Sequence, residues 1–219
     1  MNERGKKIEL LAPAGNLQSG IIAFKFGADA VYCGLKKFNA RDRAENFSFE
    51  ELARIITFAH EHSKKVYIAF NILIKESEIP EAAINIAKIA ELSPDAVIVQ
   101  DLGVLKIIRD FFPSLNIHAS TQMAIHNSFS AKIAKELGIS RVILERQLTL
   151  DEIRQISENS PVETEVFIHG ALCCSLSGQC LLSSWFGGCS GNRGKCKQAC
   201  RFPSFLRDSY YPLSTRDLA

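Results

Sequence analysis

Several features are missing from this sequence of 219 residues, and each absence excludes a class of protein. Apolar stretches such as 96–99 and 142–144 fall far short of the roughly 18 residues that a membrane-spanning helix needs. No apolar leader precedes Ile8, so secretion is not predicted. The formal net charge is only +2, which gives no global attraction to nucleic acid or to an anionic membrane. We therefore expect a cytoplasmic protein that binds no membrane and whose basic surface, where it has one, is local.

From residue 8 to residue 170, short β-branched apolar runs alternate with longer amphipathic stretches, a pattern typical of βα units in a parallel sheet. Strands are predicted at 9–12, 30–34, 65–71, 96–101, 116–121, 141–145 and 163–169. Helices are predicted at 17–26, 49–62, 80–92, 103–112, 128–137 and 150–157. Six βα units and a seventh strand therefore make up residues 8–170 of one domain, 1–219.

The predicted α/β fold is a TIM-like (β/α)8 barrel rather than a doubly wound sheet. No Gly-x-Gly-x-x-Gly turn follows the first strand, and polar residues stand at the strand ends all round. A cysteine-rich segment, 171–210, follows the seventh strand and leaves no room for a last helix and an eighth strand. We therefore expect a truncated barrel with two open sheet edges.

Polar residues at the carboxyl ends of barrel strands are candidates for an active site. His118 and His169 fall within or at the end of predicted strands and are acid–base candidates, although a buried histidine is more often a core residue. Arginines near these ends could hold a small anion by paired hydrogen bonds: Arg41, Arg43, Arg141 and Arg146. Asn39, Gln122 and Glu145 complete the candidate substrate-binding set, with helix capping and turn closure as the alternative role for such residues.

Six of the seven cysteines lie between Cys173 and Cys200, while Cys33 stands alone on a predicted strand. The odd count and the lack of a leader argue against a disulfide framework. Clustered thiols in a reducing compartment more often bind a metal or an iron–sulfur cluster. The Cys173-x6-Cys180-x15-Cys196-x3-Cys200 spacing offers four thiolates for a 4Fe-4S cluster, with zinc as the alternative, although the short Cys-x2-Cys pairs usual for zinc are missing.

The same segment is locally basic, because no Asp or Glu occurs between Glu165 and Asp208. Its cations suit an RNA phosphate backbone, and its aromatic residues could stack an extruded base. The alternative is that the positive charge compensates an all-thiolate cluster. The cations are Arg193, Lys195, Lys197, Arg201 and Arg207, and the aromatic residues are Trp185, Phe186, Phe202 and Phe205.

Five blocks, in order, resemble the collagenase-like peptidase family U32. They are 10–16 (LLAPAGN), 27–34 (GADAVYCG), 38–41 (FNAR), 118–122 (HASTQ), and the run that begins at 165–173 (EVFIHGALC) and continues through Ser177-Gly178, Cys180 and 193–200 (RGKCKQAC). The family register prefers Cys173 over the adjacent Cys174 as a ligand. The blocks span nearly the whole sequence and are specific for the family, not for one member.

The resemblance implies an oxygen-independent hydroxylase with a 4Fe-4S cluster, because the better understood members of the family are of that kind. They modify RNA or ubiquinone precursors. The RNA branches hydroxylate a wobble uridine of tRNA or a cytidine of the large ribosomal RNA, with prephenate as the implied oxygen source and a homologous subunit as a further candidate partner. The quinone branch departs from the Cys-x3-Cys pair, which this sequence retains at Cys196 and Cys200. The expected substrate is therefore RNA.

Two other functions compete with this expectation. The family name implies a peptidase, yet neither a His-Glu-x-x-His motif nor a Gly-x-Ser-x-Gly elbow occurs in the sequence. A nucleophilic cysteine among so many thiols would also compete with ligation and oxidation. The non-enzymatic alternative is an RNA-binding barrel with a structural metal ion held by four cysteines.

Overall fold

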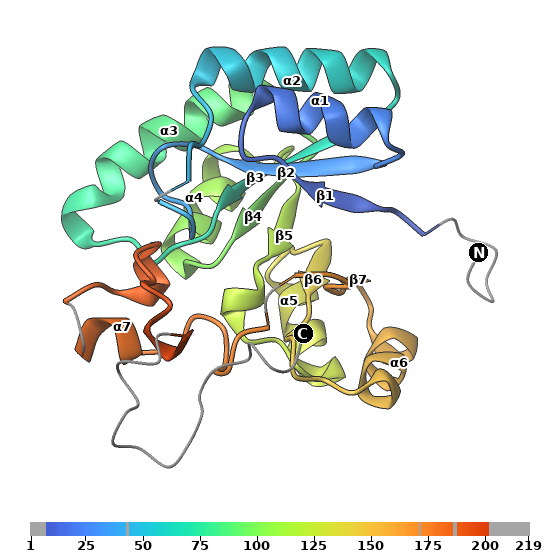
Figure 1. Ribbon diagram of the computed structural model, residues 1–219, viewed down its shortest axis with the longest axis vertical. Helices are drawn as coiled ribbons and strands as arrows, with labels where there is room; N and C mark the ends of the chain where they lie inside the picture. The colour runs from blue at the N-terminus through green and yellow to red at the C-terminus, as the bar shows by residue number, and fades with distance from the viewer. Residues whose placement is uncertain (1–7, 43, 171, 186–187, 202–219) are drawn as a thin grey trace.

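A computed structural model describes residues 8–42, 44–170, 172–185 and 188–201 of the chain. Its sheet has seven parallel strands that follow one another in sequence order, from β1 to β7 (Figure 1). The strands are β1 (Leu11–Pro13), β2 (Ala30–Gly34), β3 (Lys65–Phe70), β4 (Ala96–Val99), β5 (Ile117–Ala119), β6 (Arg141–Ile143) and β7 (Glu163–Glu165).

A helix follows each of the first six strands. These helices are α1 (Leu17–Lys25), α2 (Phe49–Glu61), α3 (Ile79–Glu91), α4 (Leu102–Phe111), α5 (Ser128–Glu136) and α6 (Leu150–Asn159). Beyond β7, the chain forms a short helix α7 (Leu182–Trp185) and two single-turn 3₁₀ helices, η3 (Gly191–Arg193) and η4 (Ala199–Arg201). Two more 3₁₀ turns, η1 (Glu76–Glu78) and η2 (Thr121–Met123), follow β3 and β5.

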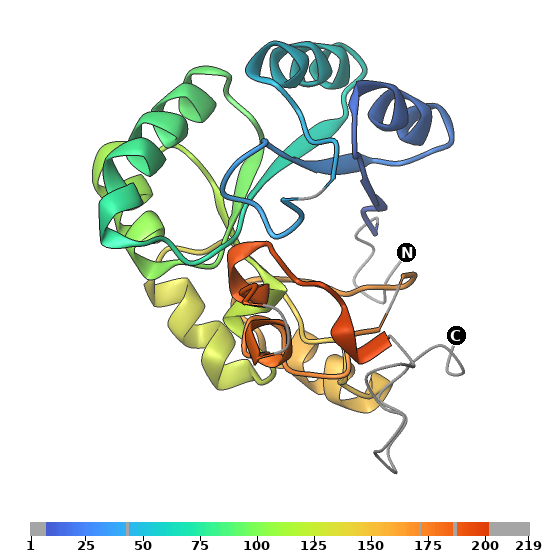
Figure 2. The ribbon, with the colours of Figure 1, turned by 60° about the vertical axis from the view of Figure 1, so that its left-hand side comes forward.

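The sheet curls into an incomplete barrel with its helices on the outside. In Figure 2 the helices form an arc from α1 (blue) to α6 (orange), and the arc is open between these two helices. Within the described part of the chain, β1 and β7 each pair on one side only, so they are the two edges of the sheet. The prediction of a truncated TIM-like barrel is confirmed.

Apolar side chains lie on both faces of the sheet. The larger cluster fills the space between the sheet and the helices, with Phe47, Leu52, Ile68 and Ile108 essentially inaccessible to solvent. A smaller cluster lines the inner face and includes Tyr67 and the short side chains of Ala30 and Ala96. The inner strands β2 to β6 are therefore mostly buried on both faces, which explains why strands such as β3 and β4 read as near-continuous apolar runs.

The helix boundaries follow the local signals in the sequence. Asn16, Ser48 and Thr149 cap helices with their side chains, and each takes part in a reciprocal capping box. Gly27 and Gly138, which end two helices, adopt positive φ angles of 103° and 78°. Predicted and observed helix ends agree to within one or two residues.

Five of the seven strands, β3 to β7, end before their predicted carboxyl ends, whereas β2 ends at the predicted residue and β1 one residue later. The seventh strand was expected to run to residue 169 but ends at Glu165, and residues 166–169 are exposed. Their apolar composition reads as a strand, yet β7 is an edge with no neighbour on one side in the described residues, so the ladder stops early. No helix in the described part of the chain is both long and apolar enough to cross a membrane.

Candidate functional site

The cysteine-rich segment, here residues 172–201, folds back over the carboxyl ends of the strands. Figures 1 and 2 show it, in orange to red, on the inner side of the arc of helices. The backbone N–H of Leu73, which follows β3, donates to the carbonyl oxygen of Asn192 at 3.1 Å. The mouth of the barrel, where TIM barrels place their catalytic groups, is therefore covered by the segment that carries the thiols.

Ser177 is the centre of one contact between this segment and the barrel. Its backbone N–H donates to Oε1 of Glu145, which follows β6, at 2.9 Å. Its hydroxyl accepts from Nη2 of Arg146 at 2.6 Å and lies 3.5 Å from the hydroxyl of Thr121. Ser177 and Glu145 are 3% and 2% exposed, so this contact is shielded from water. Two residues predicted to act on substrate, Glu145 and Arg146, thus hold the cysteine-rich segment.

Arg193 makes a second contact, with the loop after β3. Its guanidinium donates to both carboxylate oxygens of Glu78, at 2.8 and 2.6 Å, and to the carbonyl oxygen of Leu73 at 2.7 Å. Arg193 and the backbone N–H of Lys75 lower the pKa of Glu78 to about 2. Arg193 was predicted to bind RNA, but its guanidinium is occupied by this fork-like pair.

All seven cysteines are free thiols. The Cys200 thiol interacts with that of Cys174 by a hydrogen bond and with Cys173 electrostatically; burial and these two neighbours raise its pKa to about 11. The Cys196 sulfur accepts from the backbone N–H of Gln198 at 3.4 Å and from the hydroxyl of Ser183 at 3.8 Å. These are two separate thiol environments on one short segment.

The backbone of Cys180 lies near Cys196, on either side of Gly191. Its carbonyl oxygen lies 3.5 Å, and the Cβ of Cys196 3.8 Å, from the position that a Cβ on Gly191 would take. Among the described residues, no three His, Cys, Asp or Glu side chains form a group that could hold a metal ion. The four predicted ligands, Cys173, Cys180, Cys196 and Cys200, therefore share a segment without surrounding one point.

The chemistry of this donor set fits an iron–sulfur cluster. Apart from the buried Cys33, the thiols are partly or fully exposed, and none is used in a disulfide. N–H and O–H donors at the Cys196 sulfur are the kind of hydrogen bond that stabilises a ligating thiolate and tunes a cluster. Cys174 is a further candidate ligand, because its thiol is hydrogen-bonded to that of Cys200.

Beneath Ser177 lies a group of buried polar atoms without a partner in the described part of the chain. They are the Oε1 atoms of Gln100 and Gln122, the Oε2 atom of Glu145 and the Nε atom of Arg146. Residues 177–178 contact or closely approach all four side chains. Buried polar groups of this kind need a hydrogen-bonding partner, such as water or a ligand. Among the described residues, the barrel mouth therefore has three hydrogen-bond acceptor atoms and one donor atom, Nε of Arg146, without a partner.

The other predicted residues are spread more widely. Asn39 is buried, and its side chain bonds the backbone of Leu35 and of Arg41, which is a turn-closing role. Arg41 and Lys195 are exposed, and His169 is exposed beyond β7. Arg201 donates to the carbonyl oxygen of Leu172 at 3.0 Å. Arg43, Arg207, Phe186, Phe202 and Phe205 lie outside the described residues, as does 202–210 of the predicted loop.

His118 lies deeper in the barrel, on the inner face of β5. Its ring meets that of Tyr67 edge-on, with 4.7 Å between the centroids. Burial and the positive charge of Arg141 lower its pKa to about 3, so the imidazole is neutral near pH 7. Nδ1 of His118 has no partner in the described part of the chain. These contacts place His118 in the barrel interior, beside the ion pairs of Arg141.

Arg141, which opens β6, was expected to hold a small anion together with the other arginines. It is instead paired with glutamates of the chain itself: Glu9 at 2.7 Å, Glu163 at 2.7 Å and Glu165 at 3.4 Å. Burial opposes the ionisation of Glu9, but hydrogen bonds led by that of Arg141 lower its pKa to about 2. Arg141 thereby connects Glu9, which precedes β1, with Glu163 and Glu165 of β7. This links the two edge strands across the inside of the barrel.

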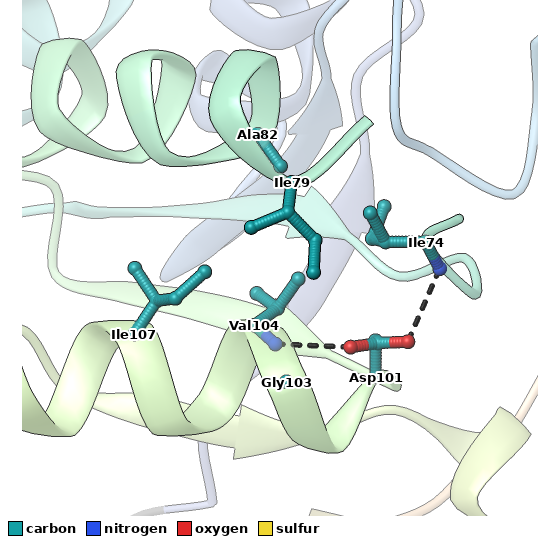
Figure 3. A pocket seen from close by; sticks show the side chains of 7 residues that line it. All are labelled: Ile74, Ile79, Ala82, Asp101, Gly103, Val104 and Ile107. Carbon is teal, nitrogen blue, oxygen red and sulfur yellow. Dashed lines mark hydrogen bonds between the residues drawn. The ribbon is translucent and has the colours of Figure 1, made fainter. Parts of the chain in front are cut away.

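A small apolar pocket of about 30 Å³ lies elsewhere, between α3 and α4 (Figure 3). Asp101 is the one charged residue in its lining. Its two oxygens accept from the backbone N–H groups of Val104 and Ile74, at 2.9 and 3.1 Å. Because one oxygen of this carboxylate caps α4 and the other holds the loop after β3, the pocket is a packing gap and offers no chemistry.

Ser177 and Glu78 dock the segment on the barrel, and Ser183 forms hydrogen bonds within the segment. The sequence predicts none of these roles, because single serines and glutamates in loops carry no distinguishing pattern. The spacing of Ser177 and Ser183 around Cys180 was the available signal.

Comparison with known proteins identifies relatives for nearly the whole chain. The family model described as Peptidase family U32 matches residues 15–219. An uncharacterized protease of Methanocaldococcus jannaschii is 44% identical over 201 residues, which are 89% of this chain and 48% of the relative. The tRNA hydroxylation protein P of Haemophilus influenzae is 40% identical over 197 residues, 90% of this chain and 43% of the relative. A 23S rRNA 5-hydroxycytidine synthase of Escherichia coli is 39% identical over 208 residues, 95% of this chain and 31% of the relative.

The chain thus spans less than half the length of these relatives. A solved structure of a U32 peptidase has a TM-score of 0.63 to this chain at 15% identity, and the match covers 76% of this chain and 70% of that one. This likeness shows a shared fold.

Proposed function

The chain belongs to peptidase family U32, and from that membership and the geometry of the barrel mouth we propose that it is part of an iron–sulfur enzyme that hydroxylates a base of RNA. Two of the relatives are named for RNA hydroxylation, one acting on tRNA and one on 23S rRNA. With RNA as the substrate, the cytoplasm is the expected location.

One observation carries the proposal: the segment that bears the thiols is docked on the carboxyl ends of the strands. Ser177 and Arg193 fix it there, and they alternate along the chain with Cys174, Cys180 and Cys196. A thiolate-bound group would therefore sit beside the strand-end polar residues, where TIM barrels perform chemistry.

Cys173, Cys180, Cys196 and Cys200 are the proposed ligands of a 4Fe-4S cluster, with Cys174 as the alternative to Cys173. Such a cluster, when bound, supplies electron transfer or Lewis acidity at iron. Zinc on the same thiolates is the alternative occupant, and it would supply structure alone. A 4Fe-4S cluster on these ligands requires the thiols of the two environments to come together until all four bind the same cluster.

The residues around the thiols supply binding functions in this proposal. Arg41 is exposed next to the mouth, and with Arg146 it could hold a small anionic oxygen donor such as prephenate. The free oxygens of Gln122 and Glu145 can accept hydrogen bonds from the N–H groups of a base. Lys195 is exposed and suited to phosphate. A homologous partner subunit would contribute further RNA contacts.

Peptidase activity is the competing function, since one relative is named a protease. In the described residues, the histidine side-chain hydrogen bonds run from His60 to Asp95 and from His62 and His126 to backbone oxygens. None joins a histidine to a serine, threonine or cysteine, so a nucleophile–base pair is not formed there. This observation favours the hydroxylase over the peptidase.

The test is mass spectrometry of tRNA and ribosomal RNA nucleosides from a strain that lacks the gene. We expect one hydroxylated base to disappear, and to return when the wild-type gene is restored. Cys196→Ser should fail to restore it, whereas Cys189→Ser, which removes a thiol outside the proposed ligand set, should restore it. Unchanged nucleosides in the deletion strain, together with cleavage of a protein substrate by the purified protein, would establish the peptidase instead.

A further inference from the structure

We infer that Gly178 and Gly194 are positioning residues that allow the cysteine-rich segment to lie directly on the backbone of the barrel mouth. The inference rests on the proposed function in one respect only: it takes the positioned thiols to be the ligands of the cluster. The docking itself follows from the contacts of the two glycines and from the hydrogen bonds beside them.

Gly178 packs against the turn that follows β5. A Cβ added to Gly178 would lie 2.5 Å from the carbonyl oxygen of Gln122 and 3.0 Å from Nε2 of Gln100. The first of these atoms belongs to the backbone and cannot rotate away. The residue also has a φ of 76°, which favours glycine. Any side chain at residue 178 would therefore lift the segment off β5.

Gly194 makes the same kind of approach to the loop after β2. A Cβ added there would overlap the carbonyl oxygen of Asn39 and would lie 3.4 Å from the Cβ of Asp42. Gly194 is buried and also has a φ of 76°. The two glycines thus approach backbone oxygens that follow β2 and β5, at two separate points of the mouth.

Each glycine stands beside a polar contact that holds it down. Ser177, which precedes Gly178, donates its N–H to Glu145, and Arg193, which precedes Gly194, pairs with Glu78. Close approach and hydrogen bonding therefore occur together at both points. Glu145 has a positioning role through Ser177, in addition to its free Oε2 atom.

The two points lie close to thiols in sequence. Gly178 lies between Cys174 and Cys180, and Gly194 lies two residues before Cys196. Each thiol environment therefore has a cysteine within four residues of a glycine contact. Release of either point would let the neighbouring thiols move relative to the others, and a cluster that needs all four ligands would lose its fixed geometry.

The chain offers matched controls for an alanine test. Gly188 and Gly170 also have positive φ angles, 61° and 133°, but a Cβ on either would meet no atom of the described residues within 4 Å. Gly188→Ala and Gly170→Ala therefore impose the backbone strain of alanine without a collision. Gly178→Ala and Gly194→Ala impose both.

The experiment compares these four variants of the intact protein by three measurements: hydrogen exchange, absorption near 400 nm and iron content per chain. We expect amides of residues 176–180 to exchange at least about tenfold faster in Gly178→Ala, and those of 191–195 in Gly194→Ala, with both controls like the wild type. Iron per chain and the absorption band should fall in the first two variants only. Far-UV circular dichroism checks that the barrel is retained, and Arg193→Met, which adds no Cβ, replaces a variant that fails this check.

Equal exchange in all four variants would overturn the inference, because the collisions would then have no effect beyond strain. Faster exchange with full iron content and an unaltered spectrum would also overturn it, since docking would then not position the thiols. Wild-type protein that holds zinc and no iron would contradict the proposed cluster; the exchange contrast would still decide the docking, and zinc per chain would replace iron as the second measurement.

Discussion

Replacement of Arg141 by methionine should destabilise the barrel strongly, because it removes the cation that pairs with Glu165 inside the molecule and one of the two that pair with Glu9, leaving only Lys65 at 2.8 Å from the Glu9 carboxylate. The Arg141 side chain is 10% exposed, and those of Glu9 and Glu165 are 19% and 18% exposed. Loss of one partner from a buried ion pair costs about 3–5 kcal/mol, and we take the low end, about 3 kcal/mol, because both glutamates keep some contact with water. Glu163 is 62% exposed and contributes little.

A cost of about 3 kcal/mol lowers the melting temperature of a domain of this size by roughly 6–12 °C. The assay is a thermal melt of the intact protein at pH 7, followed by far-UV circular dichroism. Arg154→Met is the matched control, because Arg154 and its partner Asp151 are 66% and 79% exposed and such a pair contributes less than about 1 kcal/mol. Adding Glu165→Gln to Arg141→Met should recover part of the loss. Equal melting temperatures for Arg141→Met and Arg154→Met would refute the reasoning.

Two further predictions concern His118 and Ser183. Because the folded pKa of His118 is about 3 and the unfolded value is about 6.5, the unfolded state alone takes up a proton as the pH falls, so stability should drop by roughly 2 kcal/mol between pH 7 and pH 5. His118→Gln should remove that part of the slope in melts across this range; an unchanged slope would show that His118 is not buried as described. Ser183→Ala removes a hydroxyl that bonds the Cys196 sulfur and should lower the midpoint potential of the cluster in a spectroelectrochemical titration, with Ser184→Ala as control. Equal potentials in the two variants would count against this second role.

The fold could be predicted because its signals are local and repeated. β-Branched runs, amphipathic helices, the capping boxes at Ser48 and Thr149 and the glycines at 27 and 138 each mark one boundary. Sheet order followed, since successive βα units place neighbouring strands side by side. The end of β7 could not be predicted, because it depends on which strands pair with β7, and β6 alone does so among the described residues, and not on the residues that form the strand.

The candidate site was predicted less completely. The thiols and the strand-end polar residues are visible as residue types, and the segment that carries the thiols does lie on the strand ends. Their partners are not visible: Arg193 and Glu78 lie 115 residues apart, and Ser177 and Glu145 lie 32 apart. Nothing periodic links such pairs, so Arg193 was assigned to RNA and Arg141 to an anion, although both neutralise glutamates of the same chain.

The central claim is that four cysteine sulfurs at the barrel mouth bind one iron–sulfur cluster. Metal and acid-labile sulfide analysis of the anaerobically purified protein tests it most directly. The account predicts brown protein with about four iron atoms and four sulfides per chain, and loss of both in Cys200→Ser but not in Cys189→Ser. Colourless protein that contains zinc, or iron retained after Cys200→Ser, would contradict it.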